Sequence, residues 1–96
     1  MAQLAKERVA YINGKIVPES QALVSFRDRS FLYGDAVFDT TRTFGHKIFK
    51  LKEHLDRLFR SLRYVQIDPG LSEGELAKIT EEVLQRNLHL ISKDED

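Results

Sequence analysis

The chain has 96 residues, enough for one domain with a modest core and too few for two. Its 15 lysines and arginines balance its 15 aspartates and glutamates, so it lacks the basic excess typical of proteins that bind nucleic acid or anionic membranes. Cysteine is absent, which excludes disulfides and thiolate metal sites, and no apolar run predicts a secretion signal or a membrane span. We expect a cytoplasmic protein with small-molecule or protein partners.

The first predicted element is a β-hairpin. Asn13-Gly14 separates two β-favouring runs and can adopt the positive φ angles of a two-residue turn, which predicts strands at Val9–Ile12 and Lys15–Val17. Pro18 cannot donate to a sheet ladder, so we expect the hairpin to end there. A connecting segment should then reach to about Arg29.

A second hairpin is predicted from the runs AVFDTTRTF and KIFKL, which flank Gly45-His46. Glycine suits the first central position of a type II′ turn, and His46 is interpreted as a turn residue. The two hairpins are expected to share one antiparallel sheet.

Two helices should follow. The first is predicted from about Lys52 to Gln66, because leucines and a valine recur there at spacings of four and three. Asp68-Pro69-Gly70 breaks the chain, and Ser72 with Glu75 forms a capping-box pattern. The second helix is predicted at 73–87 and should bury three apolar residues, which are Leu76, Ile79 and Val83. This order of elements predicts an α+β fold in which both helices pack on one face of the sheet.

Alternation along the third strand predicts two distinct faces. One carries Phe38, Thr40, Arg42 and Phe44, and the other carries residues 37, 39, 41 and 43. Arg42 is a lone cation in a β-rich segment. Either Phe38 and Phe44 meet the core while the stem of Arg42 packs at the sheet rim with its head in water, or this face lines a pocket where the guanidinium binds a carboxylate or phosphate.

The first helix offers a second cluster, because His54, Arg57 and Ser61 are spaced by three and four residues. One interpretation is a solvated flank on which Arg57 pairs with Glu53. The other makes Arg57 an anion anchor, for instance for a phosphate, with His54 supporting it.

Other signals of chemistry are weak. The sequence contains no glycine-rich phosphate loop, no His/Asp metal spacing and no nucleophile elbow. Asp28, Asp35 and Asp39 are too loosely spaced to predict an acid/base pair, and the first two are interpreted as capping or turn residues.

The motifs YINGKIV, DRSFLYGDAVFDTTRTF and KIFKLKEHLDRLFRS, in this order, resemble the amino-terminal domain of class IV pyridoxal-phosphate aminotransferases. That family includes branched-chain and D-amino-acid aminotransferases, R-selective amine transaminases and aminodeoxychorismate lyase. The resemblance runs from Tyr11 to about Asn87. We therefore expect three parts in the chain. Residues 1–8 should form a flexible N-terminus, residues 9–90 the amino-terminal domain, and residues 91–96 a charged tail.

The resemblance also implies roles for single residues. Arg57 in HLDRL matches the arginine that binds the phosphate of pyridoxal 5′-phosphate, and Phe38, Thr40 and Arg42 match positions that face the substrate. Tyr33, with the glycine after it, matches a loop that reaches the pocket of the neighbouring subunit in branched-chain members. A homodimer acting on an amino acid or amine and a keto acid is therefore implied.

The chain departs from the family pattern in two respects. Asp39 stands where glutamate is usual, and Thr40 and Thr41 replace the glycine and isoleucine of VFEGIR, which weighs against a branched-chain substrate. In addition, the family's Schiff-base lysine lies in a carboxy-terminal domain, and no lysine of this chain occupies a matching position. Because pyridoxal-phosphate chemistry needs that amine, the chain by itself is expected to be catalytically incomplete.

The leading hypothesis is thus the amino-terminal portion of an aminotransferase that uses pyridoxal 5′-phosphate. An enzyme of the aminodeoxychorismate-lyase type is the enzymatic alternative. A stand-alone, non-catalytic module that dimerises through exposed apolar surface is an alternative of a different class.

Overall fold

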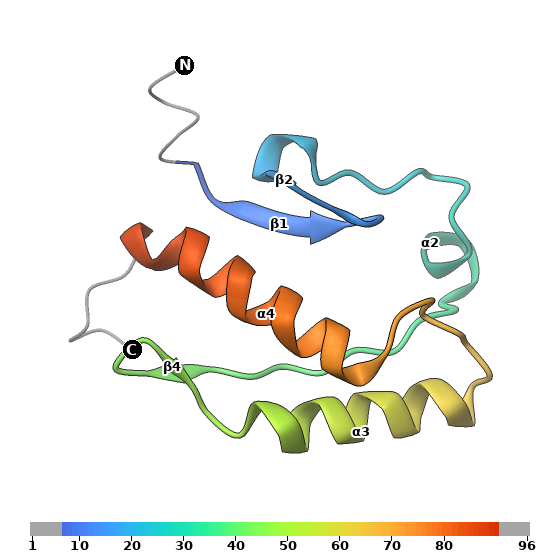
Figure 1. Cartoon of the computed structure of the whole chain (residues 1–96). Helices are drawn as coiled ribbons and strands as arrows, with labels where there is room; N and C mark the ends of the chain where they lie inside the picture. Colours follow the sequence, from blue (N-terminus) through green and yellow to red (C-terminus); the bar gives the residue numbers. More distant parts are fainter. Residues whose placement is uncertain (1–6, 91–96) are drawn as a thin grey trace. The chain divides into compact units, whose positions relative to one another are not determined.

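The computed structural model describes residues 7–90, which divide into two compact units at the junction of Ala36 and Val37. The predicted charged tail 91–96, and most of the predicted flexible N-terminus 1–8, lie outside the described residues. In chain order the elements are β1 (Val9–Ile12), β2 (Lys15–Pro18), η1 (Glu19–Gln21), α2 (Arg29–Tyr33), β3 (Thr43–Phe44), β4 (Lys47–Ile48), α3 (Leu51–Tyr64), α4 (Glu73–Asn87) and η2 (Leu88–Leu90) (Figure 1).

The α+β class is confirmed, but the strands are distributed differently from the prediction. In place of one shared sheet, the described residues contain two antiparallel sheets of two strands each, β1-β2 and β3-β4. The second sheet is short because Lys50 adopts a left-handed conformation (φ 55°) and turns the chain into α3 directly after Phe49. Residues 37–42 consequently run without a strand assignment.

The first hairpin forms as predicted. Val9 pairs with Pro18 and Ile12 with Lys15, so the proline sits at the open end of the ladder, where its missing N–H costs little. Asn13 (φ 50°) and Gly14 (φ 85°) both have positive φ, as a type I′ turn requires.

The predicted turn type of the second hairpin is wrong. Gly45 (φ 56°) and His46 (φ 67°) both lie in the left-handed region, which defines a type I′ turn, whereas type II′ has positive φ at the first position only. Histidine tolerates this conformation better than most residues. Beside the turn, the rings of Phe44 and Phe49 pack edge to face with centroids 5.3 Å apart.

The segment predicted as a plain connection contains the short helix α2. Asp28 caps its N-terminus by accepting hydrogen bonds from the backbone N–H (2.8 Å) and the hydroxyl (2.6 Å) of Ser30, which confirms the predicted capping role. Gly34 ends the helix with φ 69°. Asp35 accepts a hydrogen bond from Arg29 Nε at 2.7 Å.

The second unit contains both long helices. α3 begins one residue before the predicted start and ends two residues before the predicted end, and α4 has the predicted bounds. The core of the described residues is small, with Leu55 (7% exposed) and Leu62 (8%) of α3 buried. The predicted burial of Leu76, Ile79 and Val83 is only partial, because two helices and a two-stranded sheet leave one side of α4 uncovered.

No helix within residues 7–90 is long and apolar enough to cross a membrane.

The cap of α4 gives a first prediction. Ser72 Oγ accepts a hydrogen bond from Glu75 N (3.1 Å), and Glu75 Oε1 accepts one from Ser72 N (2.8 Å), which is the predicted capping box. Ser72→Ala should lower the free energy of unfolding by about 1 kcal/mol, measured by urea unfolding with circular dichroism. Ser72→Asp keeps an N-cap acceptor and serves as the matched control. Equal stability of the alanine variant and the wild type would contradict this role for the cap.

Candidate functional site

The extended segment 37–44 in front of α3 has two different faces. Val37, Asp39 and Thr43 are half-buried, and the Thr41 hydroxyl donates to the carbonyl of Phe49 at 3.1 Å. Phe38, Thr40, Arg42 and Phe44, which form the opposite face, are all exposed, and Phe38 is 89% exposed. The predicted alternation of faces holds for seven of these eight residues, since Thr41 of the odd-numbered face is exposed as well. The other odd-numbered residues are partly buried, and the even-numbered face is open, so Phe38 and Phe44 do not meet the core.

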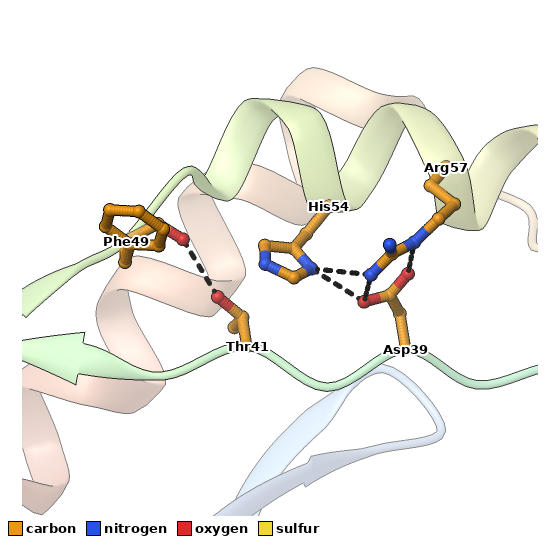
Figure 2. A network of polar contacts seen from close by, with 5 residues as sticks. All are labelled: Asp39, Thr41, Phe49, His54 and Arg57. Carbon is orange, nitrogen blue, oxygen red and sulfur yellow. Dashed lines mark hydrogen bonds and ion pairs between the residues drawn. The ribbon is translucent and has the colours of Figure 1, made fainter.

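A polar network joins this segment to α3. Asp39 Oδ2 accepts a hydrogen bond from Arg57 Nε at 2.7 Å, and Asp39 Oδ1 accepts one from Arg57 Nη2 at 2.8 Å (Figure 2). His54 Nδ1 lies 2.7 Å from the same Oδ1. Because His54 and Arg57 are three residues apart on one helix flank, both reach a single carboxylate. Arg57 therefore pairs with Asp39 and not with Glu53, the partner considered from the sequence.

The geometry shows which nitrogen of His54 carries a hydrogen toward Asp39. An ionised carboxylate only accepts hydrogen bonds, so the short contact with Asp39 requires a hydrogen on His54 Nδ1. The 3.1 Å separation between Arg57 Nη2 and His54 Nδ1 then joins two donors, which converge on one oxygen and do not bond each other. Asp39 is thus the acceptor at the centre of the network.

Burial and charge distinguish the three side chains. The side chain of Asp39 is 11% exposed, that of His54 is 23% exposed, and that of Arg57 is 57% exposed. Hydrogen bonds from Arg57, and then from His54, hold the pKa of Asp39 well below its ordinary value of 3.8. The same ion pair raises the pKa of Arg57. At neutral pH the pair is fully ionised, and the arginine head remains accessible on one side.

Arg57 borders two hollows in the surface of the second unit. The larger, of about 420 Å³, is lined by Val37, Arg57, Arg60, Ser61, Tyr64 and Val65. The smaller, of about 150 Å³, is lined by Lys50, Glu53, His54 and Arg57. The larger hollow, here called the anion hollow, is lined by two arginines and a serine, residue types whose side chains donate hydrogen bonds to phosphate or carboxylate.

The predicted site residues are distributed as follows. His54 and Ser61 flank Arg57 but border different hollows, and Phe38 and Thr40 lie on the open face of the extended segment. The Arg42 guanidinium stacks 4.0 Å from the Phe44 ring centroid, and its Nε donates to the carbonyl of Thr43 at 3.3 Å. Tyr33 belongs to the first unit, where it ends α2 and is 68% exposed.

Two residues of the site were missed from the sequence. The spacing of Asp39 predicts no role for it, although alternation places it opposite the exposed face. Arg60 was not considered, although it is one residue before Ser61 and borders the same hollow as Arg57. Among residues 7–90, no three His, Cys, Asp or Glu side chains form a group that could hold a metal ion.

Residues 36–90 match the family model of amino-transferase class IV. The chain belongs to this family. A relative from Methanocaldococcus jannaschii, provisionally named a branched-chain-amino-acid aminotransferase, is 43% identical over 77 residues, which are 80% of this chain and 27% of that protein. D-alanine aminotransferases from Staphylococcus haemolyticus and Staphylococcus epidermidis are each 34% identical over the same lengths. The chain thus spans about a quarter of the length of these relatives.

Membership accounts for the resemblance of YGDAVF and HLDRL to class IV aminotransferases and, as a property of the family in general, implies pyridoxal 5′-phosphate. The matched region includes the extended segment, α3 and α4, and therefore includes the whole Asp39 network and the anion hollow.

The lowered pKa of Asp39 predicts how the free energy of unfolding depends on pH. Because the folded-state pKa lies below the unfolded value of 3.8, the unfolded chain binds this proton first as the pH falls. The ion pair therefore stabilises the fold above about pH 4 and loses this effect in more acidic solution. Asp39→Asn should reduce the difference in unfolding free energy between about pH 7 and about pH 2, measured by urea unfolding.

Glu81→Gln on the exposed surface of α4 is the control for loss of one negative charge. An unchanged pH dependence in Asp39→Asn would mean that the carboxylate is not held by Arg57 in solution.

Proposed function

We propose that this chain is the amino-terminal portion of a pyridoxal-phosphate-dependent aminotransferase, which transfers an amino group between an amino acid or amine and a 2-keto acid. The observation that carries the proposal is the cationic head of Arg57, held by Asp39 at the edge of the anion hollow and inside the segment that matches the family. Within this proposal, residues 9–90 form the amino-terminal domain, and the lysine that holds the cofactor belongs to a carboxy-terminal domain.

The donor set of the anion hollow is compatible with the phosphate end of the cofactor. Arg57 and Arg60 supply positive charge, and Ser61 supplies a hydroxyl that can donate a hydrogen bond. Arg57 is the residue proposed to bind the phosphate. When bound, pyridoxal 5′-phosphate supplies the electron sink for the amino transfer, while the protein contributes orientation and electrostatics.

The exposed face of the extended segment is proposed to shape substrate choice. Phe38 offers an apolar surface, Thr40 offers a hydroxyl, and Arg42 offers a cation whose orientation is supported by the ring of Phe44. Tyr33 is proposed to reach the pocket of the neighbouring subunit, which would make a homodimer the active assembly. The names of the relatives differ in their substrate, so the donor is proposed only as an amino acid or amine. A cytoplasmic location is part of the proposal and is compatible with the absence of cysteine.

Activity can be tested on the protein expressed from its complete reading frame. We expect it to bind pyridoxal 5′-phosphate and to convert 2-oxoglutarate to glutamate when supplied with D-alanine or a branched-chain amino acid. Product amino acid is quantified by chromatography. Pyruvate release from aminodeoxychorismate without amino transfer would overturn the aminotransferase proposal in favour of a lyase. A reading frame that ends after Asp96 would overturn it in favour of a non-catalytic module.

The role of Arg57 can be tested by affinity. Arg57→Ala should weaken the binding of pyridoxal 5′-phosphate by roughly tenfold or more, because a charge-assisted hydrogen bond contributes about 1.5–3 kcal/mol. The dissociation constant is measured by absorbance titration of the apoprotein. Arg63→Ala removes an exposed arginine from the last turn of α3 and is the matched control. Equal affinities of Arg57→Ala and the control would remove Arg57 from the cofactor site.

A further inference from the structure

The guanidinium of Arg57 is held along one edge. Its Nε–H and one Nη2–H are donated to the two oxygens of Asp39, at 2.7 and 2.8 Å. A guanidinium has five N–H donors in a rigid plane, so a fork on the Nε/Nη2 edge fixes the direction of the remaining donors. Within residues 7–90, Arg57 Nη1 makes no hydrogen bond to the protein.

Asp39 is itself held from a second side. His54 Nδ1 donates to Oδ1 at 2.7 Å, so two residues of one helix flank clamp a carboxylate that comes from the extended segment (Figure 2). The Asp39 side chain is nearly buried at 11% exposure, whereas the Arg57 side chain is 57% exposed. Within the ion pair, the Asp39 carboxylate is therefore the clamped group, and the Arg57 side chain is the accessible one.

We propose that Asp39 is a positioning residue, which holds Arg57 by its Nε/Nη2 edge and so keeps Nη1 turned outward for the phosphate of the cofactor. This inference rests on the proposed function of Arg57 as the phosphate anchor. Asp39 acts through Arg57 and does not touch the cofactor. His54 is a second positioning residue, because it orients the Asp39 carboxylate, which in turn orients Arg57.

The two effects of Asp39 on a bound anion oppose each other. Its negative charge partly neutralises Arg57 and so weakens attraction for phosphate, whereas its fork orders the guanidinium before the ligand arrives. Arg60, which borders the same hollow, adds positive charge that offsets the first effect. The proposal is that orientation outweighs neutralisation, so it predicts that removing the carboxylate weakens phosphate binding.

The test compares two ligands on the protein from the complete reading frame, pyridoxal 5′-phosphate and pyridoxal, which lacks the phosphate. Asp39→Asn should raise the dissociation constant of the phosphorylated ligand on the order of tenfold, the lower end of what loss of a residue that orients a metal ligand costs at metal sites. The dissociation constant of pyridoxal should not change. Asp39→Glu restores a carboxylate and should recover most of the affinity, and Asp68→Asn is a control in the loop between α3 and α4.

Double variants separate positioning from a general effect on folding. In an Arg57→Ala background, Asp39→Asn should cause no further loss of affinity, because Asp39 acts only through that arginine. Should Asp39→Asn fail to fold, His54→Ala provides the second route. It removes the other clamp and should weaken pyridoxal 5′-phosphate, but not pyridoxal, by a smaller factor.

The outcomes distinguish this inference from the proposed function. Unchanged affinity in Arg57→Ala would overturn the phosphate role of Arg57 itself. A loss in Arg57→Ala together with unchanged or tighter binding in Asp39→Asn would overturn only the positioning role, and would mean that the carboxylate competes with the phosphate for the arginine. Equal losses for pyridoxal and its phosphate would also overturn positioning.

Discussion

The ion pair between Asp39 and Arg57 is the constraint on which the second unit depends. The segment 37–42 has no strand assignment. A backbone hydrogen bond from Phe49 N to the carbonyl of Arg42 (2.9 Å) holds its end, and the side chains of Asp39 and Thr41 make further polar contacts. A forked pair with low exposure of the carboxylate defines the register of the segment relative to α3 more sharply than a single bond could. Once Asp39 faces the helix, alternation requires Phe38 and Thr40 to face away from it.

The same pair connects structure to the proposed chemistry. A cation on a helix flank is ordinarily mobile and well hydrated, and such surface pairs contribute little to stability. Here the arginine is tethered at one edge by a carboxylate that a histidine also holds, beside a hollow that contains a second arginine. An ordered cation loses less conformational freedom when it binds an anion, and this is the property that a phosphate anchor needs.

Local signals predicted most of the fold, and long-range contacts account for most of what was missed. The type I′ turn at Asn13-Gly14, the leucine spacing of α3 and the capping box at Ser72 are encoded within a few neighbouring residues, and all three formed as expected. Helix α2 was missed because five residues are too few for a periodic pattern. The partner of Arg57 was missed because 18 residues separate it from Asp39, and no spacing rule connects a strand-like segment to a helix flank at that distance. The family resemblance implied a role for Arg57 but no contact between Arg57 and Asp39.

The open face of the extended segment has a consequence for how such a protein can change over evolutionary time. Substitutions at exposed positions that hold no special contact usually alter stability by less than about 0.5 kcal/mol. Phe38 and Thr40 are at such positions, while the residues between them carry the packing and the ion pair. In this segment, residues that tolerate substitution therefore alternate with residues whose contacts restrict it. Substitutions on the open face can therefore accumulate during evolution without changing the contacts on the opposite face.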